Sequence, residues 1–143
     1  MERRLSLIKS LFEKINLVKI KAKKGKNMRI KRNSEVKEVE VALKGTKGMR
    51  KRVLIGPDNG SKNITMRYFT LLPGGYSERH SHSHEHLVNI ESGRGIVVDK
   101  DGNEIEVSEG YSIFVEPDEL HQFQNPFEKN FEFICVIPNI DKR

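Results

Sequence analysis

The stretch Gly74–Gly93, GGYSERHSHSHEHLVNIESG, holds four of the chain's five histidines within seven residues. Side chains of an extended strand alternate between two faces, so His80 and His82 point to the same side. His86 has the same parity, and His121 follows after two predicted hairpins that can bring its strand beside the first. Imidazole nitrogens in such a cluster are typical ligands of Zn, Cu, Ni, Fe or Mn. The stretch therefore predicts a site for one divalent transition metal on β-structure.

Short strands separated by turn signals surround this stretch. Strand-forming residues dominate 39–43 and 64–71, and turn signals recur at 73–75, 92–95, 99–102, 108–110, 116–118 and 125–126. Such regular spacing is typical of an antiparallel sandwich or barrel. The strongest hairpin signal is the Asp101–Gly102 pair between two apolar runs. The expected fold class is therefore all-β.

The first 33 residues differ in composition from the rest. They hold 12 Lys or Arg against 2 acidic residues, a net charge of +10, whereas residues 34–143 hold 14 against 18, a net charge of −4. Apolar residues at spacings of three and four from Leu5 to Val18 predict a short amphipathic helix. We therefore expect a basic helix and linker at 1–33 and a barrel domain at 34–143. The favoured interpretation of the helix is a solvated arm or a start-site artefact, because translation from Met28 would still give a complete barrel; contact with a membrane surface or a partner is the alternative.

Composition also restricts the classes of function. The basic residues lie in the tail and not in the histidine-bearing domain, which argues against a nucleic-acid substrate, whose phosphates need positive charge around the site. The single cysteine, Cys135, excludes an intramolecular disulfide, and no apolar run approaches the roughly 20 residues that span a bilayer. These features predict a soluble, cytoplasmic protein.

Two segments resemble the paired motifs of the cupin superfamily, in particular its small single-domain conserved-barrel (cupin 2) members. The first family motif, G-x5-H-x-H-x3,4-E-x6-G, is similar to Gly74–Gly93, and the second, G-x5-P-x-G-x2-H-x3-N, is similar to Gly110–Asn125. The departures from these motifs are His86 for a glutamate ligand, Glu116 for proline and Asp118 for glycine. The resemblance implies an antiparallel jelly-roll β-barrel, a homodimer, and one metal ion held by His80, His82, His86 and His121.

His86 in place of a carboxylate changes the expected charge of the site. A neutral imidazole leaves the metal at its full +2 charge, which makes it a stronger Lewis acid with more affinity for anionic ligands. His84 has the same parity but breaks the motif spacing, so we expect it at a turn or at the rim of the pocket. The sequence does not decide among Mn, Fe, Ni, Cu and Zn.

Alternation along the later strands predicts the lining of a pocket. In 131–137, Phe133 and Cys135 should face inward, and so should Phe123, two residues after His121. In 64–71 the parity stays open, with two alternative sets of wall residues: Arg67 and Phe69, or Met66, Tyr68 and Thr70.

Three functions remain open, and no catalytic residue is assigned. The first is a metal-dependent oxidoreductase, similar to an oxygenase, that acts on a small organic substrate. An expected apolar pocket without an evident acid or base favours it, because proton transfer needs a positioned titratable group. The second is a Lewis-acid isomerase or lyase. The third is a non-catalytic module that binds a metal or a small ligand.

Overall fold

The computed structural model describes Ser6, Lys9 and residues 28–139. The chain divides into two units, Met1–Glu35 and Val36–Arg143. Apart from Ser6 and Lys9, the predicted helix from Leu5 to Val18 lies outside the described residues and stays a prediction. Within 28–139 the helical elements are two short 3₁₀ turns, Asn33–Glu35 and Pro57–Asn59. In the described part of the chain, no helix has the length and apolar character needed to cross a bilayer.

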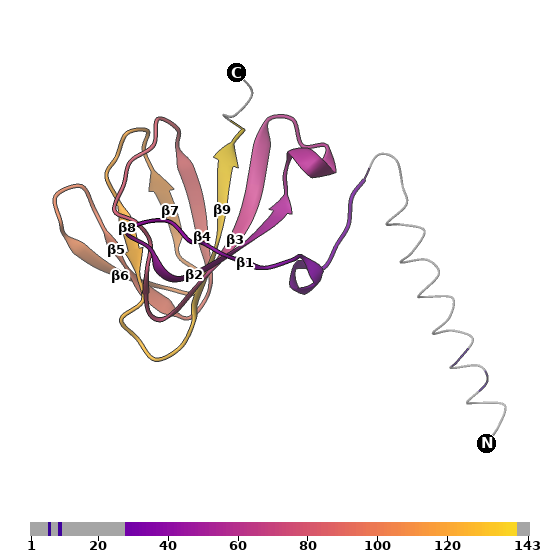
Figure 1. Cartoon of the computed structure of the whole chain (residues 1–143), viewed down its shortest axis with the longest axis horizontal. Coiled ribbons are helices and arrows are strands. Elements are labelled where there is room, and N and C mark those ends of the chain that lie inside the picture. Colours follow the sequence, from indigo (N-terminus) through magenta and orange to yellow (C-terminus); the bar gives the residue numbers. More distant parts are fainter. Residues whose placement is uncertain (1–5, 7–8, 10–27, 140–143) are drawn as a thin grey trace. The chain divides into compact units, whose positions relative to one another are not determined.

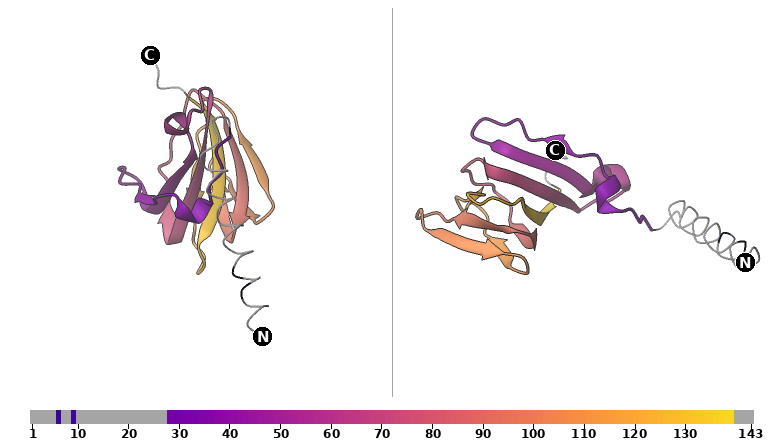
Figure 2. Two further views of the ribbon diagram at one scale, coloured as in Figure 1. Left: turned by 90° about the vertical axis from the view of Figure 1, so that its right-hand side faces the viewer. Right: turned by 90° about the horizontal axis from the view of Figure 1, so that it is seen from below.

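The second unit is an antiparallel β-structure (Figure 1). Its strands are β1 (Val39–Glu40), β2 (Lys47–Ile55), β3 (Ile64–Tyr76), β4 (His86–Ser92), β5 (Arg94–Val98), β6 (Glu104–Ser108), β7 (Ser112–Val115), β8 (Gln122–Gln124) and β9 (Phe131–Pro138). Their order in the sheet is β6-β5-β8-β3-β9-β4-β7, with β2 paired to β3 and β1 to β2. The sheet curls into a half-barrel, as the two further views in Figure 2 show. The predicted all-β antiparallel class is therefore confirmed.

Strand β3 joins the two parts of the sheet and bends between them. It pairs with β9 over Ile64–Leu71 and with β8 at Tyr76. Between these contacts lies Pro73–Gly75, where Gly74 has a φ of 79° and the register with β2 shifts. The predicted turn at 73–75 was therefore wrong, because the strand continues through it. Glycine's access to positive φ allows a bulge here instead of a chain reversal.

The other predicted turns lie at strand ends. The Asp101–Gly102 hairpin connects β5 to β6, and Gly102 has a φ of 83°. A carboxylate oxygen of Asp99 accepts hydrogen bonds from the backbone N–H groups of Asp101 and Asn103, both at 2.9 Å. This side chain thus stabilises the turn by replacing backbone partners.

The core lies on the concave face of the curled sheet. Strand β9 alternates as predicted, because Phe131, Phe133 and Cys135 are buried while the residues between them are partly exposed. Asn125 is 1% exposed and holds the loop before β9 in place. Its side-chain amide donates to the carbonyl oxygens of Leu71 and Lys129 at 2.9 and 2.8 Å. The asparagine of the second motif thus has a structural role.

Apolar residues form a row across the convex face. Phe114 of β7 lies opposite Leu87 of β4, Leu87 lies opposite Val136 of β9, and Val136 lies opposite Met66 of β3. Phe114, Leu87 and Met66 are 54%, 52% and 39% exposed. A contiguous exposed apolar patch is typical of a protein–protein contact.

We expect this row to join two copies of the chain in a homodimer. Leu87→Asp should give a monomer, because it places a charge in the middle of the contact. Light scattering measures the mass. The matched control is Ile105→Asp, since Ile105 is 49% exposed on β6, at the other end of the sheet, and this variant should stay dimeric. A monomeric wild-type chain, or a dimeric Leu87→Asp variant, would contradict the prediction.

Candidate functional site

A backbone bridge joins the two histidine segments. The N–H of His80 donates to the carbonyl of His121 at 3.1 Å, and the N–H of His121 donates to the carbonyl of His80 at 3.0 Å. Residues that exchange both hydrogen bonds across an antiparallel pair lie directly opposite each other. Next to this bridge, the N–H of Asp118 donates to the carbonyl of His82 at 2.6 Å. Asp118 has a φ of 62°, so aspartate adopts here the left-handed conformation that glycine adopts more readily.

The four predicted ligand histidines lie on the wall of one cavity of about 170 Å³. The predicted pocket residues Phe123, Phe133 and Cys135 also line this cavity. The open question about β3 is settled, because Arg67 and Phe69 are on the inner wall. The remaining lining residues come from β2, from the segment before it and from the segment before His80: Val41, Leu43, Thr46, Met49, Lys51, Ser77 and Glu78.

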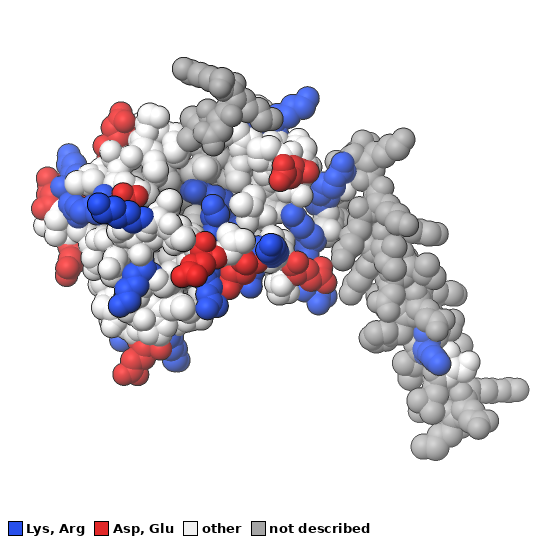
Figure 3. Space-filling model, viewed as in Figure 1, with Lys and Arg blue, Asp and Glu red and all other residues white. Residues whose placement is uncertain are grey.

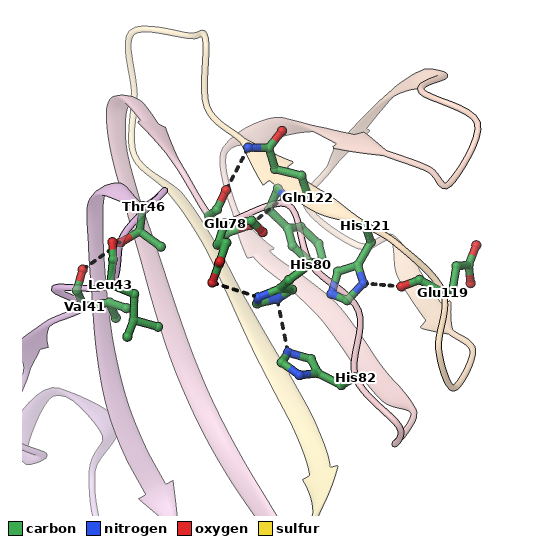
Figure 4. A network of polar contacts seen from close by, with 11 residues as sticks. Val41, Leu43, Thr46, Glu78, His80, His82, Glu119, His121 and Gln122 are labelled. Carbon is green, nitrogen blue, oxygen red and sulfur yellow. Dashed lines mark hydrogen bonds and ion pairs between the residues drawn. The ribbon is translucent and has the colours of Figure 1, made fainter.

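The rings of His80, His82 and His121 lie close together (Figure 4). Nε2 of His80 and Nε2 of His82 are 3.1 Å apart. The centroid of the His86 ring lies 5.1 Å from that of His82 and 5.2 Å from that of His121. His84 stacks on His82 at 4.8 Å between centroids and is only partly buried, as expected for a rim residue.

Oxygen acceptors beside His121 and His80 influence which ring nitrogen carries the proton. Nδ1 of His121 lies 2.8 Å from the carbonyl oxygen of Glu119, and because a carbonyl only accepts, this nitrogen carries the proton. Nδ1 of His80 faces a carboxylate oxygen of Glu78 at 3.5 Å. Metal-binding histidines commonly donate their second ring N–H to such partners. Nε2 of His121 is thus left as an electron-pair donor, and the contact with Glu78 favours the same tautomer of His80.

His86 gives the clearest sign that a metal ion fits here. This side chain is 6% exposed, and its Nδ1 lies 3.3 Å from the sulfur of Cys135. Its Nε2 is buried without a hydrogen-bond partner, which is costly unless something else satisfies it. The 3.1 Å between the Nε2 atoms of His80 and His82 also agrees with the separation of about 3.0 Å expected for two ligands at right angles with bonds of about 2.1 Å.

The rings as they stand do not form a complete coordination shell. In the described part of the chain, no group of three or more His, Cys, Asp or Glu residues has its donor atoms placed to hold a metal ion. The planes of His82 and His86 are stacked at 21°, so some rings would have to turn about their side-chain bonds to share an ion. The donor types fit a transition metal, and binding itself stays a prediction.

Burial keeps these imidazoles neutral. It lowers the pKa of His86 to about 3, with the positive charge of Arg67 as the next cause. It lowers the pKa of His82 to about 4, with repulsion from His80 next. Burial also lowers the pKa of His121, although the hydrogen bond to the Glu119 carbonyl opposes the shift. The neutral ring is the form that binds a metal.

We expect the metal-free protein to lose stability as the pH falls from about 6.5, the usual histidine pKa, toward 3. Because the folded-state pKa values of His82 and His86 are about 4 and about 3, the unfolded chain binds more protons in this range. Stability should be complete above the range and decline within it. Urea unfolding across the range measures this. His86→Leu should make the decline shallower, and an equal slope in both proteins would contradict the prediction.

A curled antiparallel sheet with a histidine-lined cavity on its concave face defines the class of protein, and comparison with known proteins agrees. Residues 67–137 match the family model of the cupin domain, Cupin_2, so this part of the chain is a cupin domain. Cupin domains commonly bind a metal ion. The predicted resemblance to cupin 2 barrels is confirmed at this level.

Particular relatives cover different shares of the chain. The polyketide cyclase RemF of Streptomyces resistomycificus is 28% identical, with a TM-score of 0.75 over 78% of this chain and 79% of that one. A cupin 2 conserved barrel protein of Rhodopseudomonas palustris is 26% identical, with a TM-score of 0.66 over 76% and 75%. The 1-methylthio-D-xylulose 5-phosphate methylsulfurylase of Rhodospirillum rubrum is 33% identical over 73 residues, 50% of this chain and 46% of that protein. The chain thus spans about half the length of this curated relative.

None of the three charged residues that line the cavity, Lys51, Arg67 and Glu78, was assigned to it from the sequence. Glu78 lies two residues before His80, and this shared parity could have placed it on the same wall. The expectation of a pocket without an evident acid or base was therefore wrong. The sequence left open whether Arg67 or its neighbours on the strand face inward. Arg67 lies opposite Cys135 of β9, which places it on the inner wall.

Proposed function

We propose that this protein is a metal-dependent enzyme in which His80, His82, His86 and His121 hold one divalent transition metal beside a small organic substrate. When bound, the metal supplies a Lewis acid that polarises a substrate oxygen. The observation that carries the proposal is that Glu78 lines the same cavity as the histidines. A carboxylate beside a Lewis acid favours proton transfer, as in an isomerase, a lyase or a cyclase.

Residues of the chain would carry out proton transfer and exclude water from the cavity. Glu78 is the only carboxylate among the described residues that line the cavity, so it is the group that would take or return a substrate proton. It also faces Nδ1 of His80 at 3.5 Å, which helps to orient this ring. The rings of Phe69, Phe123 and Phe133 line the cavity and exclude water, which strengthens electrostatic interactions inside it.

The names of two relatives support a small organic substrate. One is a polyketide cyclase, and the other is named for a reaction of 1-methylthio-D-xylulose 5-phosphate. Both names describe chemistry on organic molecules of low mass. They do not select a substrate for this chain, whose cavity of about 170 Å³ is below the range of about 300–1,000 Å³ that is typical for drug-sized ligands.

An oxidoreductase is the second candidate, supported by the all-imidazole donor set and the apolar lining. The thiol of Cys135 also faces the cavity, but burial raises its pKa, with the charge of Arg67 opposing the shift. A protonated thiol is a poor nucleophile and oxidises slowly. This candidate therefore has the imidazole donors and the apolar lining in its support, whereas proton transfer also has a carboxylate in the cavity, Glu78.

Zinc distinguishes the two candidates because it has no redox chemistry. The zinc-loaded protein, incubated in deuterated buffer with a panel of small keto and hydroxy-keto compounds, should exchange protons next to the carbonyl, as followed by NMR. Glu78→Gln should abolish exchange and keep the metal. Glu116→Gln, which changes an exposed carboxylate outside the cavity, should leave exchange intact. Oxygen consumption by the iron or manganese form without exchange by the zinc form would favour the oxidoreductase, and neither activity would favour a binding module.

A further inference from the structure

Arg67 is a cation on a largely apolar wall. It lies on β3 opposite Cys135 of β9, and the neighbouring inward pair is Phe69 and Phe133. The rings of Phe69 and Phe133 have centroids 5.5 Å apart, and Phe123 stacks on Phe133 at 4.7 Å. A partly buried guanidinium among three phenylalanine rings needs a polar partner to compensate for lost hydration.

The partners of Arg67 within the described residues do not include an oxygen atom. One Nη donates to the sulfur of Cys135 at 3.1 Å, a weak acceptor, and the guanidinium carbon lies 4.9 Å from the centroid of the Phe69 ring. Nε is buried and has no hydrogen-bond partner. No carboxylate in the described part of the chain forms an ion pair with this side chain. The charge of this guanidinium therefore has no anionic partner among the described residues.

The charge of the cavity differs from that of the outer surface. Over the face seen in Figure 3, basic and acidic side chains are interspersed. Inside the cavity, Lys51, which lies on β2 opposite Phe69, accompanies Arg67, and the described lining residues include one carboxylate, Glu78. The lining is thus cationic even before a metal ion is added. A cationic, partly apolar cavity concentrates small anions.

We propose that Arg67 forms an anion subsite in this cavity and that the substrate is a small organic oxyanion. The guanidinium presents a planar fork of donors that fits a carboxylate or a phosphate group. The apolar body of the ligand packs against the rings of Phe69, Phe123 and Phe133. This inference names the substrate class of the proposed enzyme, but the subsite itself does not depend on a bound metal.

Calorimetry with three probes tests the subsite in the metal-free and the metal-loaded full-length protein. Benzoate carries a carboxylate on an apolar ring, benzamide is its neutral analogue, and inorganic phosphate represents the other oxyanion. Benzoate should bind at least about tenfold more tightly than benzamide, and Arg67→Gln should remove at least about tenfold of the benzoate affinity. Arg79→Gln should change nothing, since Arg79 is exposed and donates to the backbone carbonyls of Asp99 and Lys100. Arg67→Lys should be intermediate, because it keeps the charge and loses the fork.

Circular dichroism shows whether each variant folds, and the comparison of benzoate with benzamide on the wild-type chain needs no variant. Phosphate bound in place of benzoate, again dependent on Arg67, would support the subsite and assign it to phosphate esters. Equal affinities of wild type and Arg67→Gln for both anions, or no anion binding by either form of the protein, would overturn it. His121→Ala separates this inference from the proposed function: binding that depends on Arg67 but needs no metal supports the subsite alone. Anion binding that needs the metal and ignores Arg67 leaves only the enzyme proposal.

Discussion

His82→Ala and His121→Ala should each reduce the metal content from about one ion per chain to nearly none. Each substitution removes one imidazole from a set of four, and a site missing a ligand binds much more weakly, since even the loss of an outer hydrogen-bond partner commonly costs about 10–100-fold in affinity. Elemental analysis after expression in metal-balanced medium gives the number of ions per chain. Calorimetric titration of the metal-free proteins then gives the affinities.

His84→Ala is the matched control for this experiment. His84 belongs to the same stretch and stacks on His82 at 4.8 Å between ring centroids, but it lies outside the motif spacing. We expect this variant to keep its metal ion. If both His82→Ala and His121→Ala kept a full equivalent, the metal site would have to lie elsewhere in the chain.

Phe131→Ala should lower the free energy of unfolding by about 3–5 kcal/mol. The side chain is 0% exposed, and its ring lies 5.3 Å from that of Phe133 between centroids. Gly95 fits against this ring, because a Cβ atom at that position would overlap it. The cavity left by alanine therefore has tightly packed surroundings that cannot easily collapse. Urea unfolding followed by circular dichroism measures the loss.

Tyr111→Ala is the control for the core variant, because Tyr111 is 51% exposed. A surface substitution of this kind changes stability by about 0.5 kcal/mol or less. Gly95→Ala should also be destabilising, since the added methyl group would push against the same ring. Losses below about 1 kcal/mol for both Phe131→Ala and Gly95→Ala would show that this part of the core is looser than its burial indicates.

Local patterns predicted the fold class because an antiparallel sheet is encoded by alternation and turns. They could not distinguish a turn from a bulge at Pro73–Gly75, since glycine at positive φ occurs in both. Only the pairing of β3 with β9 on one side and β8 on the other shows that the chain continues. The alternation at 39–43 likewise predicted a strand, but the strand is only Val39–Glu40. Beyond it, the N–H of Val41 still donates to the carbonyl of Met49 at 2.9 Å.

The histidines of the candidate site could be predicted from the sequence, whereas Arg67 could not. The structure places all four histidines on one cavity wall. The expected strand alternation was wrong for His82, which lies in a non-strand segment between His80 and β4, so the motif spacing decided its place. Arg67 could not be placed in this way, because neighbouring residues of β3 are strand formers on both faces. Its side became known only through pairing with Cys135, which is distant in sequence.

The effect of an insertion in the chain depends on where it lies relative to the backbone bridge between His80 and His121. The hairpin of β5 and β6 lies between these residues in sequence, and its Asp101–Gly102 tip is exposed. Extra residues at this tip would add loop length without moving either end of the bridge, and longer loops cost little free energy. An insertion between His80 and His86 would instead lengthen the non-strand segment that carries His82, and would change where the His82 ring lies relative to His80 and His86. The histidine cluster can therefore tolerate a lengthened hairpin, and new contacts with larger molecules could be added there while the chemistry of the cavity stays the same.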